Sequence, residues 1–331
     1  MLRRALLATA VAAVLAPALA RAQGTTQPAA DWPRQTIRLI VPFAPGGASD
    51  FAARLMQTRL ASLLGQTIVV DNRAGAAGNV GFDAAARSAP DGYTLFLGNV
   101  GTVSINPTLF PSLKIEPEKV FTAVSIVADT PGLLIAHPSF PPNDAREFVA
   151  YVKERQGKVN FASPGSGSLN RLEMELFRTN AGLEMTHVPF KGGAGPAVND
   201  ILGGHVETMF VTISSAIAQV QGGQLKGLGV TTRSRLPGLP NVPTLIEQGF
   251  PESVSSSWQG VFVPVGTPAP IVARLHAAIV ETMKDETIRS RMAEAGVIAV
   301  SSPTPQDFSA YIAEDAAKWA RVIKLTGIQP D

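Results

Sequence analysis

The sequence predicts an α/β fold with two lobes and mainly parallel sheets, and three observations support this prediction. Short runs rich in Val, Ile, Leu and Phe alternate with helical patterns, and most lack the alternation typical of half-exposed strands. Glycine-rich breaks directly follow several of these runs, where parallel sheets place their ligand loops. Proline-rich connections interrupt the alternation in the middle of the chain, which indicates a second lobe.

The candidate strands are short apolar runs bounded by turn residues. In chain order they are residues 37–43, 67–71, 94–97, 133–137, 159–162, 185–190, 208–212, 225–231 and 260–263. Because these runs are apolar at most positions, we expect helices to cover both faces of the sheets.

The helical patterns between these runs have recognisable starts. One pattern follows Ser49 and ends at Gly65. Four more begin at Asn143-Asp144, Gly195-Pro196, Thr267-Pro268 and Thr304-Pro305. The residues expected to face inward are Ala52, Leu55, Met56, Leu63, Leu64, Phe148, Val152, Val198, Ile201, Leu202, Ile271, Leu275, Ile279, Phe308, Ile312, Trp319 and Ile323.

Two proline-rich connections, near 131–142 and 236–243, divide the chain. We expect residues 31–124 and 232–331 to form lobe 1 and residues 125–231 to form lobe 2. A chain that leaves one lobe, builds a second and returns places two linkers side by side, which gives a hinged cleft.

The first residues have the pattern of a secretory signal peptide. Arg3 and Arg4 precede an apolar run at 5–16, and Ala20-Arg21-Ala22 reads as a cleavage site. We expect export of the chain, with residues 1–22 removed by cleavage after Ala22. Cleavage after Ala20 and an uncleaved membrane anchor are the alternatives.

Charge and cysteine content exclude several classes of function. The formal net charge of +2 includes three arginines and no acid in the first 22 residues, so the mature chain carries about −1. We find no concentrated basic face and expect no nucleic-acid partner. The absence of cysteine excludes disulfides, Cys-ligated metals and thiol catalysis.

Three glycine-rich breaks lie between an expected strand and an expected helix. They are APGGASD at 44–50, SPGSGS at 163–168 and KGGAG at 191–195. Glycine lets a ligand approach the backbone, and a helix start offers unpaired N–H donors that favour a carboxylate or phosphate. The hydroxyls of Ser49, Ser166 and Ser168 add neutral donors. The alternative for Ser49 and Ser168 is that each only caps a helix.

Two charged residues in these breaks leave alternatives open. Asp50 can receive a ligand ammonium group, order its loop, or favour the helix dipole as a first-turn acid. Lys191 can pair with a ligand carboxylate or remain in solvent.

Catalytic and metal-binding patterns are weak. The four histidines are His137, His187, His205 and His276. They show no metal-site spacing, and His187 in an apolar strand is more typical of a structural histidine. Glu173 and Glu175 fall on different helix faces, where we expect solvent. We therefore expect no cofactor, no metal and no enzymatic activity.

Several longer segments, taken in order, resemble the Bug family. They are VPFAPGGASD (41–50), VVDNRAGAAGNVG (69–81), DGYTLFLGN (91–99), FASPGSGSLNRLEMELF (161–177), HVPFKGGAGPAVNDILGGHVETMF (187–210), RLPGLPNVPTLIEQGFP (235–251) and WQGVFVPVGTP (258–268). Members of this TctC-like family are the periplasmic substrate-binding receptors of tripartite tricarboxylate transporters. The resemblance runs from about Trp32 to the C-terminus.

This resemblance implies a two-lobed periplasmic-binding-protein fold of the Venus flytrap kind, similar to type II. It implies a periplasmic receptor that closes on a small carboxylate: a di- or tricarboxylate, an acidic amino acid or an aromatic acid. We expect the receptor to be a monomer. Membrane transporter subunits would be its partners. A receptor that reports to a membrane sensor is the alternative, and a periplasmic serine hydrolase using Ser166 or Ser168 is a third possibility.

The resemblance also implies which residues hold the carboxylate, through backbone N–H groups, hydroxyls and bridging waters. In lobe 1 they are Phe43, Ala44, Gly46, Gly47, Ser49, Asp50, Gly98 and Asn99. In lobe 2 they are Ser163, Gly165, Ser166, Gly167, Ser168, Phe190, Lys191 and Gly192.

The sequence departs from the family pattern at a few positions. Ala74 and Ala77 stand where proline and glycine are common, and Phe190 stands where tyrosine is common. The missing tyrosine hydroxyl favours a less polar ligand. The segment 211–220 is variable in the family, and we expect it to influence selectivity.

Overall fold

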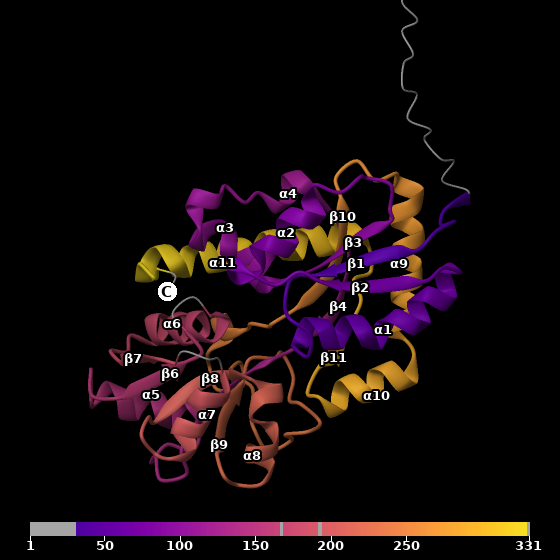
Figure 1. Ribbon diagram of the computed structural model, residues 1–331. Coiled ribbons are helices and arrows are strands. Elements are labelled where there is room, and N and C mark those ends of the chain that lie inside the picture. Colours follow the sequence, from indigo (N-terminus) through magenta and orange to yellow (C-terminus); the bar gives the residue numbers. More distant parts are fainter. Residues whose placement is uncertain (1–30, 166–167, 191–193, 330–331) are drawn as a thin grey trace, which may run out of the picture.

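The computed structural model describes residues 31–165, 168–190 and 194–329, which form two lobes around separate mixed β-sheets (Figure 1). The expected signal peptide and the candidate residues Ser166, Gly167, Lys191 and Gly192 lie outside the described residues. No helix in the described ranges is long and apolar enough to cross a membrane.

Lobe 1 contains a six-stranded sheet in the order β11-β4-β10-β3-β1-β2. Its strands are β1 (Ile37–Val41), β2 (Ile68–Asn72), β3 (Thr94–Asn99), β4 (Phe121–Asp129), β10 (Gln259–Pro264) and β11 (Ile298–Ala299). Its helices are α1 (Ala48–Leu64), α2 (Asn79–Ala86), α3 (Asn106–Leu109), α4 (Pro117–Val120), α9 (Ala269–Met283), α10 (Glu286–Glu294) and α11 (Pro305–Thr326). Residues of α1, α9 and α10 share one apolar core cluster, and those of α2 and α11 share another.

Lobe 2 contains a five-stranded sheet in the order β7-β6-β8-β5-β9. Its strands are β5 (Gly132–Ala136), β6 (Asn160–Ser163), β7 (Thr186–Pro189), β8 (Thr208–Thr212) and β9 (Lys226–Val230). Its helices are α5 (Ala145–Lys153), α6 (Leu169–Ala181), α7 (Ala194–Leu202) and α8 (Ile217–Gln221).

The helix starts follow local chemistry that is visible in the sequence. Asp144 caps α5 and Thr304 caps α11, since each side chain accepts a hydrogen bond from a backbone N–H of the first turn. Gly65 ends α1 with a φ of 74°, a left-handed conformation that glycine adopts without strain. These three predicted helix ends are confirmed.

The expectation of mainly parallel sheets is wrong, because both sheets are mixed. Strand β1 is parallel to β2 and β3, and β6 is parallel to β7 and β8. However, β10 is antiparallel to β3 and β4, and β5 is antiparallel to β8 and β9. The chain enters lobe 2 along β5 and re-enters lobe 1 along β10, so each entry strand runs away from the junction while its neighbours run towards it.

The lobe boundaries expected from the proline-rich segments also need correction. The boundary after residue 124 falls inside β4, a strand that the sequence analysis did not predict. Leu239, Val242 and Leu245 are buried in the core clusters of lobe 2, so the segment 236–243 is no linker. We propose that the chain crosses between lobes near residues 130–131 and returns near 255–257.

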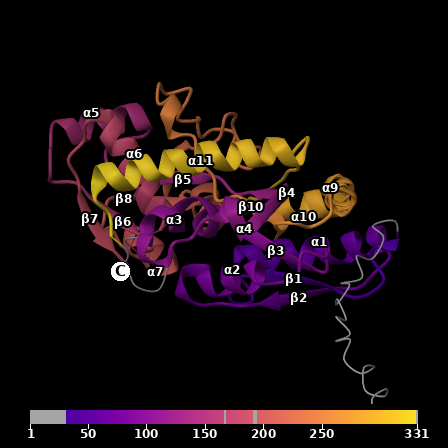
Figure 2. The same cartoon turned by 90° about the horizontal axis from the view of Figure 1, so that it is seen from above.

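The crossing segments lie side by side and form the hinge. Ser257 N donates to Thr130 O at 2.9 Å, and Pro131 forms an isolated antiparallel bridge with Ser256. A second contact between lobes lies beside this hinge, where α6 packs against α11 (Figure 2). Leu172 and Leu176 of α6 are buried in a core cluster that otherwise belongs to lobe 1.

Candidate ligand-binding cleft between the lobes

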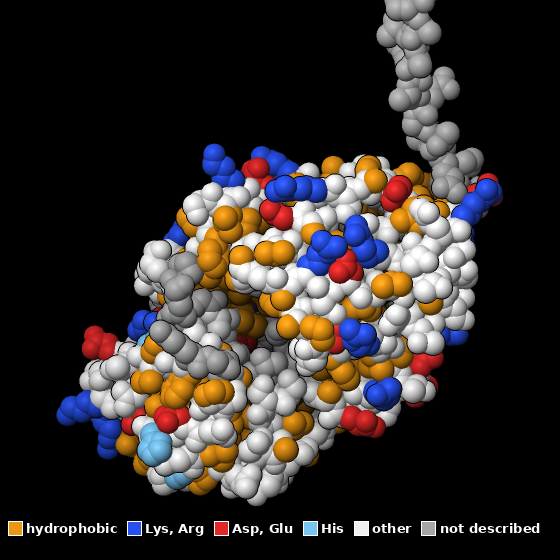
Figure 3. Space-filling model, viewed as in Figure 1, with side chains coloured by type: hydrophobic (Ala, Val, Ile, Leu, Met, Phe, Trp, Pro, Cys, Tyr) orange, Lys and Arg blue, Asp and Glu red, His pale blue; other side chains and the backbone are white. Residues whose placement is uncertain are grey.

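A cavity of about 480 Å³ lies between the lobes, and Figure 3 shows the molecular surface hollowed there. From lobe 1 it is lined by Ala76, Ala77, Asn79, Asn106, Leu109, Phe110, Ser112 and Leu113. From lobe 2 it is lined by Pro164, Gly165 and Ser168. None of these described lining residues carries a charged side chain.

A left-handed turn immediately before α2 forms one edge of this cavity. The φ angles are 137° at Gly75, 47° at Ala76, 55° at Ala77 and 91° at Gly78. Left-handed backbone is unfavourable for alanine, so the turn stores strain at two successive residues. The N–H groups of Ala76 and Ala77 form no hydrogen bond with another described residue. Both residues are exposed and line the cavity, so their N–H groups can bind either water or an acceptor there.

Asn79, the first residue of α2, supplies a further unsatisfied donor. Its Oδ1 accepts from Asn106 Nδ2 at 2.9 Å, and the same Asn106 amide donates to Ala77 O at 3.0 Å. These two bonds fix the orientation of both amides, with the nitrogen of Asn79 on the unbonded side. Asn79 is 8% exposed, and its Nδ2 has no hydrogen-bond partner in the described structure. A buried amide group without a partner is costly, which favours a bound oxygen at this position.

Apolar side chains form the adjacent wall of the cavity. Leu109, Phe110 and Leu113 come from α3 and the turn that follows it. Leu113 is 51% exposed, although leucine is usually buried. This wall suits an apolar part of a ligand rather than a second polar group.

Lobe 2 contributes the start of α6. Ser168 caps this helix by accepting from Arg171 N at 3.2 Å, and its hydroxyl donates to Gly165 O at 2.8 Å. Ser168 is therefore a helix cap that also lines the cavity. The start of a 13-residue helix favours a negative charge.

Ser163, at the end of β6, holds the same loop through a hydrogen bond. Its hydroxyl lies 2.7 Å from His187 Nε2, and it donates to Gly165 O at 3.0 Å. Ser163 is fully buried. His187 is thus held in a side-chain hydrogen bond, as expected for a structural histidine.

The predicted loop 43–50 lies at the end of β1 but does not line this cavity. Gly46 N, Arg54 Nε and Asn72 Nδ2 donate to the Asp50 carboxylate at distances of 2.9 to 3.0 Å. Burial acts to raise the pKa of Asp50, but these hydrogen bonds and the positive charge of Arg54 hold it below the usual value. These contacts favour the loop-ordering alternative for Asp50.

The other residues of this loop differ in how far they are buried. Ser49 is buried, and its hydroxyl donates to Gln259 Oε1 at 2.6 Å. Ala44, Gly46 and Gly47 are exposed, and the start of α1 has no side-chain cap. Phe43 is half-buried, and its carbonyl accepts from Asn72 Nδ2 at 3.0 Å.

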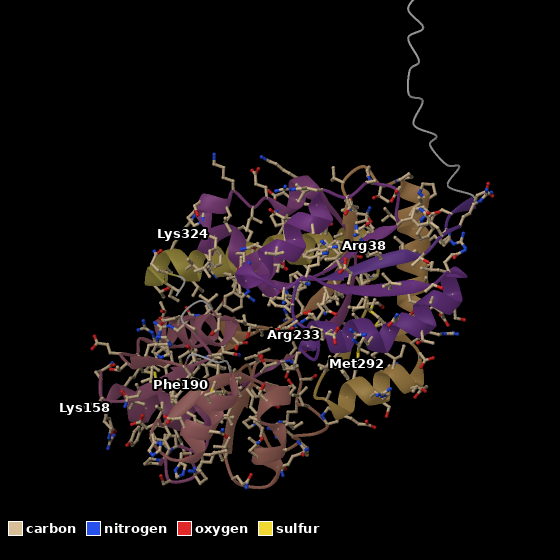
Figure 4. All side chains as sticks on the ribbon, in the orientation of Figure 1. Arg38, Lys158, Phe190, Arg233, Met292 and Lys324 are labelled. Carbon is tan, nitrogen blue, oxygen red and sulfur yellow. The ribbon has the colours of Figure 1, made fainter. Side chains whose placement is uncertain are left out.

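The remaining predicted residues pack against, or cap, other elements of the fold. Gly98 is buried, and a Cβ there would lie 2.8 Å from Phe262 and 2.9 Å from Phe96. Asn99 caps the π-helical turn Val100–Ile105 by accepting from Thr102 N at 2.9 Å. Phe190 is half-buried against a core cluster of lobe 2, where Figure 4 labels it.

Sequence reasoning missed the lobe 1 side of the cavity, which centres on the turn at 75–78, Asn79 and Asn106. A signal was present, because RAGAAG at 73–78 is a fourth glycine-rich break between an expected strand and a helix. Asn106 gave no comparable signal, since its role depends on contact with a residue 27 positions away. Within the described ranges, no group of three or more His, Asp or Glu side chains is arranged to hold a metal ion.

Comparison with known proteins assigns the chain to a family. The model of the tripartite tricarboxylate transporter family receptor, TctC, matches residues 52–328. The chain belongs to this receptor family. BugT of Bordetella pertussis is 36% identical to it over 297 residues, which are 89% of this chain and 90% of the relative. The resemblance to Bug receptors is therefore confirmed.

Solved structures of similar proteins share the receptor's fold. The Rhodopseudomonas palustris protein Rpa4515, solved with adipate, is 32% identical with a TM-score of 0.76, covering 91% of this chain and 100% of that chain. MatC from the same species, solved with bound malate, is 35% identical with a TM-score of 0.72, covering 88% and 100%. The two-lobed α/β periplasmic-binding-protein fold is confirmed for this receptor.

Proposed function

We propose that this receptor captures a small carboxylate between its lobes in the periplasm and presents it to a tripartite tricarboxylate transporter. TctC-family receptors are periplasmic substrate-binding proteins. Relatives were solved with adipate and with malate, which are both dicarboxylates. These relatives support the ligand class, while the cleft of this chain supports the location.

The observation that carries the proposal is the set of unsatisfied donors in the cavity between the lobes. The N–H groups of Ala76 and Ala77 and the amide of Asn79 lie on one side, and the start of α6 lies on the other. Because the described lining includes no acidic side chain, a carboxylate meets attraction there without direct repulsion. The Leu109–Phe110–Leu113 wall suits the carbon skeleton of the ligand.

Capture follows from the connection of the lobes by two short crossing segments. The ligand binds the two lobes at once in the closed state and only one lobe in the open state, so it favours closure. We propose that the exposed backbone of residues 44–47 and the uncapped start of α1 also face the ligand. The same proposal extends to Ser166, Gly167, Lys191 and Gly192, which lie outside the described residues.

A thermal-shift screen tests the proposed ligand class. The purified mature protein is heated with adipate, malate, glutamate and benzoate, and with glucose and putrescine as non-carboxylate controls. A ligand at 100 times its Kd stabilises the folded state by about 2.7 kcal/mol, which gives a measurable increase in Tm. Stabilisation by glucose or putrescine, with none by any carboxylate, would contradict the proposal.

A hydrolase is the second candidate, because Ser163 Oγ at the end of β6 lies 2.7 Å from His187 Nε2 on β7. Ser163 is fully buried, and its hydroxyl is also bonded to Gly165 O, so a substrate has no access to it in this conformation. The Ser168 hydroxyl is engaged in the helix cap. Turnover of p-nitrophenyl esters that is lost in Ser163→Ala or Ser168→Ala would establish an enzyme instead.

Uptake and sensing share the capture step and differ in the membrane partner. We propose the transporter, because the family is named for it. We also propose that the receptor works as a monomer. Loss of ligand uptake in cells that lack this receptor tests the first point, and light scattering of the purified protein tests the second.

A further inference from the structure

Glu173 of α6 is a buried acid beside the hinge, although its sequence position predicts a solvated residue. It is 3% exposed. Ser255 Oγ donates to its Oε1 at 2.7 Å, and Asn170 Nδ2 donates to its Oε2 at 2.9 Å. Within the described residues it forms no ion pair, in contrast to Glu175, which pairs with Arg171 and Arg178. A buried carboxylate with only two neutral donors is poorly compensated for its lost hydration.

The contacts of Glu173 join the two crossing segments of the hinge, and the end of β9 packs beside them. A Cβ at Gly132, where β5 begins, would lie only 2.6 Å from Glu173 Oε1. Thr231, after β9, accepts from Gly132 N at 2.8 Å and donates to Ser255 O at 2.8 Å. Ser255 lies on the returning segment. The Glu173 carboxyl is therefore packed against the chain both where it enters and where it leaves lobe 2.

The same helix connects the hinge to the cleft and to lobe 1. Ser168, at its start, lines the ligand cavity. Leu172 and Leu176, on either side of Glu173, are buried in the core cluster shared with α11 of lobe 1. Separation of α6 from α11 would therefore open the surroundings of Glu173 and change the position of the cavity edge.

Lys318 is the cation that acts on Glu173, and several acids on the neighbouring elements share it. Lys318 of α11 pairs with Asp315 at 2.9 Å and donates to Val254 O at 3.3 Å. Asp129, at the end of β4, has an Oδ1 that is buried without a partner in the described structure. Exposed Glu252, Glu314, Tyr311 and Arg233 line the cavity beside them, and Figure 4 shows Arg233 at the junction of the lobes.

Water has a route to this region from the side of Asp129. A cavity of about 550 Å³ is lined by Asp129, Ser256, Asp315 and Lys318, among others. Burial raises the pKa of Glu173 to about 7, against the opposing effects of Ser255, Asn170 and Lys318. Burial and the negative charge of Asp315 raise the pKa of Asp129 to about 6. Glu173 thus changes charge near neutral pH.

We propose that Glu173 is a proton-sensitive positioning residue of the hinge. Its protonated carboxyl stabilises the described arrangement of the lobes, and its ionisation favours an arrangement in which α6 separates from α11. The physical reason is hydration, because an ionised Glu173 gains free energy from water that it cannot reach in the packed hinge.

Small-angle X-ray scattering of the ligand-free mature protein tests this proposal between pH 5 and pH 8.5. We expect the radius of gyration of the wild type to rise as the pH increases from 5 and to level off above about pH 7. Glu173→Gln, which mimics the protonated acid, should keep the low-pH value throughout. Ser255→Ala removes a donor that favours the ionised form, so it should move this rise to higher pH.

Glu184→Gln is the matched control, because Glu184 is an exposed acid of the same lobe. It should reproduce the wild-type curve. A pH-independent radius in the wild type would overturn the proposal, and so would a Glu173→Gln curve that follows the wild type. Circular dichroism at each pH establishes that the variants are folded, and Ser255→Ala provides the test if Glu173→Gln does not fold.

A consequence for ligand affinity rests on the proposed function, whereas the scattering experiment requires no ligand. If closure buries Glu173, the wild-type Kd for adipate should increase relative to that of Glu173→Gln by about tenfold or more from pH 5 to pH 7, with little further change above pH 7. Titration calorimetry with adipate measures this ratio. Failure of adipate to bind either protein would count against the ligand class, and an unchanged ratio with tight binding would count against the hinge proposal.

Discussion

Asp50 shows how a single side chain can determine whether a glycine-rich break is ordered before a ligand arrives. Its carboxylate accepts from Gly46 N in the loop, Arg54 one turn along α1 and Asn72 on β2. These bonds fix the loop against the neighbouring strand. The loop backbone is therefore positioned in advance, which would lower the entropic cost of binding if this loop faces the ligand as proposed.

Ala77 is the residue at which the departure from the family pattern has a direct physical consequence. Its φ of 55° is left-handed, and an L-residue pays about 1 kcal/mol or more for that conformation. Ala77→Gly should therefore raise the free energy of unfolding by about 1 kcal/mol, measured by urea denaturation.

Ala84→Gly is the control for this substitution, because Ala84 lies in the right-handed interior of α2. Glycine should destabilise the protein there by about 1 kcal/mol. Equal losses of stability at both positions would show that the turn before α2 is not strained.

Asn79 supplies a test of the sign of the ligand's charge. Asn79→Asp keeps an oxygen to accept from Asn106 but replaces the unpartnered amide with a negative oxygen. A like charge near the ligand costs about 1 to 2 kcal/mol, so the Kd of a bound carboxylate should increase about five- to thirtyfold. Titration calorimetry measures this change.

Asn143→Asp, at an exposed site before α5, makes the same chemical change outside the cavity lining and should leave affinity unchanged. If Asn79→Asp binds the carboxylate as tightly as the wild type, Asn79 does not contact the ligand or its bridging waters.

At the scale of elements, α6 combines a capping residue with a cavity edge. Ser168→Ala should cost about 1 kcal/mol of stability through loss of the cap. It should also weaken carboxylate binding, because the start of α6 faces the cavity. Chemical denaturation and calorimetry on one preparation separate the two effects.

Thr304→Ala is the matched capping variant, because Thr304 caps α11 in the same way and does not line the cavity. It should lose similar stability and keep full affinity. An equal loss of affinity in both variants would mean that Ser168 acts only through general stability.

The elements that sequence reasoning missed are those whose environment is set by distant segments. Strand β4 is different, because Phe121, Val124 and Ile126 are typical strand residues and the run was simply overlooked; it lies between β10 and β11. The segment 236–243 has the proline content of a linker, but Leu239 and Val242 are buried in lobe 2. Local composition cannot report which surface a segment will meet.

At the scale of the molecule, the raised pKa of Glu173 gives a definite sign to the pH dependence of stability. The unfolded value is 4.5 and the folded value is about 7, so the folded state holds the proton more tightly. This stabilisation is fully present below pH 4.5 and is lost as pH rises through about 7. Glu173→Gln lacks this loss. Its stability relative to the wild type should therefore increase by about 3 kcal/mol from pH 5 to pH 8.

Urea denaturation at pH 5 and pH 8 measures this difference, with Glu184→Gln as the control that should show none. Asp129 titrates in both proteins and therefore cancels in the comparison. A relative stability that stays constant, or that changes in favour of the wild type, would mean that Glu173 is ionised in the folded state at pH 5.

The sequence by itself determined the alternation of strands and helices, the helix starts at Asp144 and Thr304, and the receptor family. These features depend on side chains close together in the chain or on whole motifs, so linear order is sufficient to reveal them. It also indicated the loop at 163–168, from which Gly165 and Ser168 line the cavity.

Only the tertiary structure decided which polar groups remain available to a ligand. Ser49 is hydrogen-bonded to a residue 210 positions away, and its hydroxyl donor is used. Asn79 is hydrogen-bonded to a residue 27 positions away, yet its amide nitrogen keeps an unpartnered donor. The burial of Glu173 likewise depends on three segments that meet only at the hinge. Whether a polar group is buried and hydrogen-bonded depends on the residues packed around it. When those residues are distant in the chain, the local sequence does not reveal them.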